Sequence, residues 1–255
     1  MRVIKIGGRA QNDGRLGSLI RHVWSVSRGE ICLVHGGGDE ISAMQRALGR
    51  EAAFVGGRRV TGHGDLELLR MVLSGIVNKR LVNALVAAGI PAVGLSGEDG
   101  ALIGAELIDA ASLGFSGRPV GINAVLLRTL LVGGYLPVIS PVGYDVTSGS
   151  GGVLNVNGDD AAAAIAIALK AEELILIADV EGVRNEDGET ISALSCDAAH
   201  ELVTSGTAGG GMAAKLESAE AALSAGVTRV RVSDLDALRD ETRGTFITQS
   251  QSVVI

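Results

Sequence analysis

The sequence predicts an α/β fold in which helices cover both faces of a mainly parallel, open sheet. Short apolar runs, bounded by glycine or polar residues, alternate along the 255 residues with longer segments of helical periodicity. The apolar runs are continuous, which is typical of strands that are buried on both faces of a parallel sheet. Together these observations indicate repeated strand–helix–strand units in a three-layer αβα arrangement.

The expected elements follow one another in a regular order. Strands are predicted at 2–6, 31–34, 91–95, 101–108, 136–140, 174–178 and 229–232, the last being the final strand of the core. Helices are predicted at 16–26, 41–48, 66–88, 158–170 and 213–225, with a hairpin at 54–60. No low-complexity linker interrupts the chain, so we expect two lobes, 1–170 and 171–255, that share one sheet. The carboxyl ends of its parallel strands should meet along one edge.

Composition and charge argue against several classes of protein. Apolar residues make up 47% of the chain, enough for a substantial core. The net charge is −7 and no basic run occurs, which argues against nucleic acid as a partner. The longest uninterrupted apolar run, 161–169, is far shorter than the ~20 residues that span a bilayer, and no signal-peptide pattern is visible. Cys32 and Cys196 form neither a disulfide framework nor a metal-ligand pattern, so we expect a cytoplasmic protein without a membrane segment.

Lysine is rare in this chain, and its placement is informative. Only Lys5, Lys79, Lys170 and Lys215 occur, whereas arginine supplies all the other permanently charged cations. Lysine carries a compact point charge, while arginine suits flat, two-point contacts with carboxylates. Lys5 and Lys215 lie beside glycine-rich segments, which indicates an anion site, although four lysines are few enough for this placement to arise by chance.

Three glycine-rich segments border the predicted elements. Lys-Ile-Gly-Gly at 5–8 ends the first strand, and His-Gly-Gly-Gly at 35–38 ends the second, just before a helix. Gly-Gly-Gly at 209–211 opens the helix that carries Lys215. Backbone N–H groups in such turns and at helix N-termini bind phosphate or carboxylate. Each segment alone could be only a tight turn, and the P-loop motif G-x-x-x-x-G-K-[ST] does not occur.

Three polar segments complete the candidate site. Segment 57–61 carries adjacent arginines in a hairpin, where Arg59 could grip a carboxylate or could lie in solvent. Asn155, Asn157 and Asp159 precede a helix, so Asp159 could be a functional carboxylate or only the helix N-cap. Segment 179–183 is a loop after a buried strand.

Taken in order, these segments resemble the amino acid kinase family, and the resemblance extends from residue 5 to residue 245. Segments 77–79, 94–100, 136–141 and 226–227 match the family as well. The resemblance implies the amino acid kinase fold, a three-layer αβα sandwich, and ATP-dependent phosphorylation of a carboxylate. It is strongest to members that convert the side-chain carboxylate of N-acetyl-L-glutamate to an acyl phosphate in arginine and ornithine biosynthesis.

The resemblance also implies roles for individual residues. Lys5 and Lys215 would flank the transferred phosphoryl group, and Asp159 would orient both lysines and keep them protonated. The acidic small-molecule substrate would be bound by Gly37, Gly38, Arg59 and Asn155. The nucleotide would be bound by Gly8, by Asp179, Val180, Glu181, Gly182, Val183 and Arg184, and by Thr207, Ala208 and Gly209.

The cofactors implied are ATP and Mg²⁺, with the metal held by ATP oxygens and water and by no protein ligand. Substrate binding and dimerisation would belong to the N-terminal lobe, and ATP binding to the C-terminal lobe. Because a carboxylate is already nucleophilic at pH 7, neither a general base nor a catalytic histidine is expected.

Two departures from the family pattern leave the substrate open. Arg9 stands where relatives carry a smaller or uncharged residue, and segment 113–118 differs near the expected substrate lid. One alternative is a sibling kinase that acts on aminoadipate or glutamate attached to a carrier protein, or on another N-acylated acidic amino acid. Another is a catalytically silent nucleotide-binding regulator, against which the joint presence of Lys5, Asp159 and Lys215 argues.

The expected assembly is a homodimer. Helix 66–88 carries apolar residues suited to an interface between two copies, although the same residues could pack on the sheet. They are Leu68, Leu69, Val72, Leu73 and Ile76. In arginine-inhibited hexameric relatives an extra helix precedes the first strand, whereas here the first predicted strand begins at Arg2. We therefore expect no strong inhibition by arginine.

Overall fold

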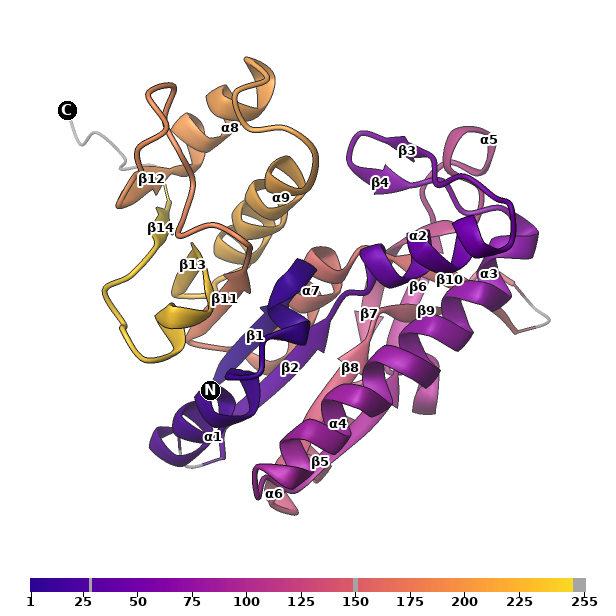
Figure 1. Cartoon of the computed structure of the whole chain (residues 1–255), viewed down its shortest axis with the longest axis horizontal. Helices are drawn as coiled ribbons and strands as arrows, with labels where there is room; N and C mark the ends of the chain where they lie inside the picture. The colour runs from indigo at the N-terminus through magenta and orange to yellow at the C-terminus, as the bar shows by residue number, and fades with distance from the viewer. Residues whose placement is uncertain (28, 149–150, 250–255) are drawn as a thin grey trace.

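An eight-stranded sheet crosses the whole molecule (Figure 1) in the computed structural model, which describes residues 1–27, 29–148 and 151–249. The strand order is β12-β14-β13-β11-β1-β2-β8-β5. The six parallel strands are β1 (Arg2–Ile6), β2 (Ile31–His35), β5 (Ala92–Ser96), β8 (Leu136–Ser140), β11 (Glu173–Ile177) and β13 (Arg229–Ser233). At one edge, β14 (Thr245–Thr248) runs antiparallel to β13 and pairs in parallel with β12 (Ala193–Ser195). Residues 1–170 and 171–255 both contribute to this one sheet.

Helices cover both faces of the sheet, so the predicted three-layer arrangement is confirmed. One face is covered by α1 (Leu16–Val26), α2 (Gly38–Ala47), α3 (His63–Arg70) and α4 (Asn78–Ala87), and the other by α6 (Ala124–Val132), α7 (Gly158–Leu169), α8 (Cys196–Thr204) and α9 (Gly210–Ser224). Successive β1 side chains point to opposite faces, because side chains alternate along a strand. Val3 therefore packs in the core with α7 and Ile4 in the core with α1. The same alternation directs Lys5 toward α7.

Smaller elements surround the end of the sheet where the site lies. A closed four-stranded barrel is formed by β6 (Ile103–Leu107), β7 (Ser116–Ile122), β9 (Val142–Asp145) and β10 (Gly152–Val156). The hairpin of β3 (Phe54–Val55) and β4 (Arg58–Arg59) rises above the same edge of the sheet as the start of α9 (Figure 1). Short helical turns occur at Gly8–Asn12, Asp99–Ala101, Ala110–Leu113 (α5) and Leu235–Leu238.

Several elements were not predicted from the sequence. The expectation that 229–232 is the final core strand is wrong, because β14 follows it and pairs with β13. β7 contains Gly117, Pro119 and Gly121, which argue against a strand, but the barrel supplies it with partners on both sides. The strand expected at 101–108 begins only at Ile103, since Ala101 has a φ of 51° in the preceding turn.

Segment 66–88 lies within one long helical path, as predicted, but a π-helical stretch, Met71–Val77, joins α3 to α4. Leu68, Leu69, Val72 and Leu73 are buried within their own chain, so the prediction that they line an interface is wrong for these four. Ile76 is 48% exposed and the neighbouring Met71 60% exposed. Across the described residues, no helix is both long and apolar enough to cross a membrane.

Candidate active site

Three charged side chains meet at the carboxyl ends of β1 and β11. Lys5 Nζ lies 3.0 Å from Asp159 Oδ1, and Lys215 Nζ donates to both Asp159 oxygens at 3.1 Å. All three residues are buried. The Cβ of any larger residue at position 7 would lie 2.6 Å from Lys5 Nζ, so Gly7 leaves room for this ammonium group. The three residues that the sequence marked as catalytic are therefore in direct contact.

Asp159 is free for this role because a neighbour caps its helix. The Asn157 side chain accepts a hydrogen bond from the Asp159 N–H at 2.7 Å and is the N-cap of α7. The alternative that Asp159 is only the helix cap is therefore wrong. Asp159 lies in the first turn of α7, where the helix dipole also favours a negative charge.

The electrostatics of the cluster are set by burial and by mutual charge. Burial alone would raise the pKa of the Asp159 carboxyl, but Lys5 and Lys215 outweigh it and the pKa is lowered. Burial and then repulsion by Lys5 lower the pKa of Lys215 to about 8, despite the nearby carboxylate. Asp159 opposes this lowering, and a lysine with a pKa of about 8 is still mainly protonated at pH 7.

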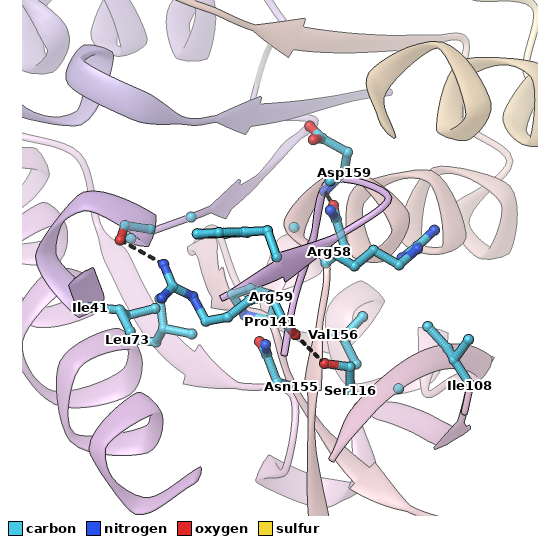
Figure 2. Close-up of a pocket in the computed structure, with 18 of the residues that line it drawn as sticks. Ile41, Arg58, Arg59, Leu73, Ile108, Ser116, Pro141, Asn155, Val156 and Asp159 are labelled. Carbon is cyan, nitrogen blue, oxygen red and sulfur yellow. Dashed lines mark hydrogen bonds between the residues drawn. The ribbon is translucent and has the colours of Figure 1, made fainter. Parts of the chain in front are cut away.

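A cavity of about 180 Å³ opens beside this cluster. Its walls come from the loop after β2, the β3–β4 hairpin, the π-helical stretch, β7 and the β10–α7 junction. Figure 2 shows Arg59 and Asn155 together at one end and Asp159 toward the other. Of the residues predicted to bind the acidic substrate, Gly37, Gly38, Arg59 and Asn155 all line this cavity.

Arg59 is held in place before any ligand binds. Its guanidinium donates to Gln45 Oε1 at 2.6 Å, and to the Gly38 carbonyl and Ser42 Oγ at 2.9 Å. The Phe54 ring covers it, with 4.7 Å between the guanidinium carbon and the ring centroid. A guanidinium has five N–H groups, so these three bonds leave one N–H on Nε and one on Nη1 for a ligand. The alternative of a solvated hairpin arginine is wrong for Arg59, because the residue is only 8% exposed.

Asn155 and two glycines of the cavity are also positioned by their neighbours. Asn155 Nδ2 donates to Thr61 Oγ1 at 2.9 Å, which orients the amide. A Cβ at Gly37 would lie 2.6 Å from a Leu73 methyl group, so a larger residue there would displace this side chain of the π-helical stretch. Gly38 begins α2, whose first N–H groups have no partner within the helix.

The predicted nucleotide-binding residues lie beyond the cavity, on the C-terminal side of the Lys5–Asp159–Lys215 cluster. Segment 179–184 follows β11, and 207–209 precedes α9, which carries Lys215. Gly8 has a φ of 54°, and a Cβ there would lie 2.7 Å from an Asp179 oxygen. The Asp179 carboxylate accepts the Arg9 N–H at 3.0 Å. The structure thus brings Gly8 and Asp179 together, while open space surrounds Gly209 at the start of α9.

Comparison with known proteins agrees with this geometry. Residues 1–234 match the amino acid kinase family. The chain belongs to this family. The predicted family and the predicted kinase class are thereby confirmed.

The relatives within the amino acid kinase family are similar over most of the chain. This chain is 40% identical over 260 aligned residues to the acetylglutamate kinase of Cereibacter sphaeroides, and the alignment covers 98% of this chain and 88% of that protein. It is 43% identical to the acetylglutamate kinase of Rubrobacter xylanophilus, covering 88% and 85%. Among solved structures, smu.665 from Streptococcus mutans superposes with a TM-score of 0.88 at 30% identity, covering 97% of this chain and 98% of that one.

The sequence did not reveal every residue of this amino acid kinase that shapes the site. Arg58 pairs with Asp160 on α7 and approaches Glu217 on α9 to 3.9 Å. At the tip of the same hairpin, a Cβ on Gly57 would lie 2.7 Å from the Gly210 carbonyl oxygen. The hairpin therefore bridges to the C-terminal part of the chain. No local signal predicts this, since the partners are far apart in sequence.

Proposed function

We infer that this chain is an ATP-dependent kinase that phosphorylates the side-chain carboxylate of N-acetyl-L-glutamate. The observation that carries this inference is the arrangement of Asp159 between Lys5 and Lys215, beside a cavity that contains Arg59. The relatives described above, which are named acetylglutamate kinases, supply the substrate. The retained charges argue against a silent nucleotide-binding regulator, because such a protein has no need of them.

The reaction follows from what these groups can do. The substrate carboxylate attacks the γ-phosphorus of ATP; a new acyl O–P bond forms, and the bond between γ-phosphorus and the ADP oxygen breaks. Arg59 and Asn155 hold the acidic substrate in place, and the backbone around Gly37 and Gly38 offers N–H groups. Lys5 and Lys215 offset the charge on the transferring phosphoryl group, while Asp159 fixes their positions. No proton has to be removed from the nucleophile.

The nucleotide enters as MgATP and binds chiefly on the C-terminal lobe, with Gly8 of the N-terminal lobe beside it. We assign it to Gly8, to Asp179, Val180, Glu181, Gly182, Val183 and Arg184, and to Thr207, Ala208 and Gly209. Exposed glycines at the start of α9 allow close approach of phosphate groups. The N-terminal lobe, residues 1–170, holds the acid, and residues 171–255 hold the nucleotide. The reaction takes place in the cytoplasm, where ATP is supplied.

A hydroxylamine trap for acyl phosphate tests this function. The purified protein is given ATP and Mg²⁺ with N-acetyl-L-glutamate, glutamate, aspartate or N-acetylaspartate, or with aminoadipate or glutamate attached to a carrier protein. We expect the largest kcat/KM with N-acetyl-L-glutamate. Preference for another acid would contradict the proposed substrate. Activity only on carrier-bound aminoadipate or glutamate would favour the sibling kinase.

The proposed assembly is a two-fold homodimer that uses the exposed side of the π-helical stretch. Met71 and Ile76 place apolar side chains on the surface there, and open space surrounds Gly75 between them. Light scattering should give the mass of two chains, and Ile76→Asp should give a monomer. Activity should change little when arginine is added up to millimolar concentration. A hexameric mass, or inhibition by sub-millimolar arginine, would contradict this proposal.

A further inference from the structure

His35 is buried behind the glycine loop, residues 36–38, which lines the cavity. The mechanism above does not use this histidine. Its side chain is 0% exposed. His35 Nδ1 lies 2.8 Å from the Gly36 carbonyl oxygen, and Nε2 lies 3.1 Å from Asn78 Nδ2. The ring thus connects the glycine loop to the start of α4.

The proton on His35 can be placed by following the contacts of Asn78. Lys79 Nζ lies 3.0 Å from Asn78 Oδ1, and an ammonium group can only donate, so this atom is the amide oxygen. Asn78 Nδ2 therefore donates, and it does so to the Val138 carbonyl at 2.9 Å and to His35 Nε2. Nε2 must accept, so the neutral ring carries its proton on Nδ1 and donates it to Gly36. Burial lowers the pKa of His35 to about 4, which keeps the ring neutral near pH 7.

This bond fixes the direction of one peptide unit. The Gly36 carbonyl and the Gly37 N–H belong to the same peptide, and no cis peptide bond occurs in the described chain. In a trans peptide the two groups point in opposite directions. The carbonyl is held toward the buried His35 ring, so the Gly37 N–H points away from that ring, and Gly36, Gly37 and Gly38 all line the cavity. Among described residues, no group accepts a hydrogen bond from this N–H.

The hydrogen-bonded path from Gly36 through His35 and Asn78 ends at Lys79. A Cβ at Gly94 on β5 would lie 2.0 Å from Asn78 Oδ1 and 2.9 Å from Lys79 Nζ, so glycine there leaves room for both. The resulting path runs from the Lys79 ammonium through Asn78 and His35 to Gly36. Each donor in such a chain polarises the next. The positive end of the path therefore strengthens the Gly37 N–H as a donor to an anion.

We propose that His35 and Asn78 are positioning residues, which turn the 36–37 peptide so that its N–H binds an anionic oxygen atom in the cavity. The inference rests on the proposed function for the identity of that oxygen, which belongs to the substrate carboxylate or to the phosphoryl group. Neither residue touches substrate.

Two substitutions at position 35 separate positioning from simple packing. In His35→Asn the amide nitrogen takes the place of Nδ1 and can still donate to Gly36. In His35→Gln the amide lies near the place of Nε2 and contacts Asn78 instead. Gln fills more of the buried volume, so thermal unfolding should rank it at least as stable as Asn. Hydroxylamine-trap rates should show the opposite order, with His35→Asn about tenfold faster than His35→Gln. An activity order that follows stability would overturn the proposal.

The Gly37 amide itself gives a readout that does not depend on turnover. In ¹⁵N-glycine-labelled protein, we expect the assigned Gly37 amide proton to shift downfield and saturate as inorganic phosphate is added. The shift should persist in His35→Asn and be lost in His35→Gln. A wild-type protein that phosphorylates no acid but shows this pattern would refute the proposed function and leave the positioning role standing. A Gly37 amide that does not respond to phosphate or to N-acetyl-L-glutamate would refute the positioning role.

Discussion

A buried acid lies among cations at each end of the paired strands β1 and β11. The two clusters are built from different cations. At the carboxyl ends, Asp159 lies between Lys5 and Lys215. At the amino ends, Glu173 lies 3.1 Å from Nε of both Arg2 and Arg229 and 3.5 Å from Arg231 Nε. Lys5 and Arg2 are on the same strand, so one sheet supports both clusters.

The two clusters differ in where their donors point. The Arg231 guanidinium is 1% exposed, donates to the Asp240 and Arg243 carbonyls, and stacks on Phe246. These contacts tie the loop before β14 to the sheet. The lysine cluster instead borders an open cavity. Arginine, with fixed planar donors, therefore serves the closed structural cluster, whereas lysine, a compact charge, suits the open cluster that we propose contacts the transferred phosphoryl group.

The comparison is tested most strongly by removing one cation from each end. Lys215→Ala should lower turnover by about 10³-fold or more with the fold retained, because it removes charge that complements the transition state. Arg229→Ala, at the opposite end, should leave turnover within about twofold. Initial rates from the hydroxylamine trap and circular dichroism check both. Near-normal turnover in Lys215→Ala would show that the lysine cluster is not catalytic.

The arginine cluster should matter for stability. Glu173→Gln leaves Arg231 buried without a carboxylate, so the free energy of unfolding should fall by about 3 kcal/mol. Turnover of the folded protein should change little. Glu241→Gln removes the exposed partner of Arg2 and should lower the free energy of unfolding by only about 0.5 kcal/mol. Urea unfolding measures the free energy of unfolding of both variants. Equal losses in the two variants would mean that the buried ion pairs of Glu173 stabilise the fold no more than an exposed pair does.

Arginine also occurs at the cavity, where its role can be separated from that of lysine. Arg59→Lys should raise the KM for N-acetyl-L-glutamate by about tenfold or more and the KM for ATP by much less, because lysine cannot reproduce the planar donors that hold Arg59 against Gln45, Gly38 and Ser42 and leave an N–H for the acid. Arg58→Lys is the matched control, since a lysine there can still pair with Asp160. Steady-state kinetics with each substrate varied in turn decide the point. Equal changes in both KM values would remove Arg59 from the acid site.

The smallest expected effect is a pH dependence of activity and stability, which a lysine at position 215 produces and an arginine there would not. Lys215 has a pKa of about 8 in the folded protein, against an ordinary value of 10.5. In the proposed mechanism the protonated form binds phosphate, so kcat/KM for ATP should fall as pH rises through about 8. Between about pH 8 and 10.5 the unfolded chain binds the extra proton, so this residue's contribution to stability should rise with pH.

Lys215→Arg isolates this effect, because arginine keeps its charge throughout the range. The variant should be slower but should lack the alkaline fall near pH 8. Its stability should also lack the rise that the lysine contributes. A variant that keeps the same alkaline limb would assign the limb to another group.

The sequence predicted the main sheet and the charged residues but not every element that surrounds them. The strands of the parallel core were predictable because their apolar runs are continuous, and 174–178 corresponds to β11 within one residue at each end. β7 was not predictable, because its glycines and proline disfavour a strand until the barrel supplies hydrogen-bond partners. The interface prediction failed for Leu68 and its three apolar neighbours because helical periodicity identifies an apolar face but not what covers it.

Local sequence patterns were enough to predict the layered α/β fold, the glycine segments at strand ends, and the candidate residues Lys5, Asp159, Lys215 and Arg59. These depend on local periodicity, on backbone freedom and on side-chain chemistry, all of which a short segment contains. The packing of the folded chain decided that Asp159 meets Lys5 and Lys215, and that Arg58 reaches Asp160. It alone decided that burial lowers the pKa of Lys215. Such properties depend on distances and desolvation between segments far apart in the chain, and no local pattern encodes them.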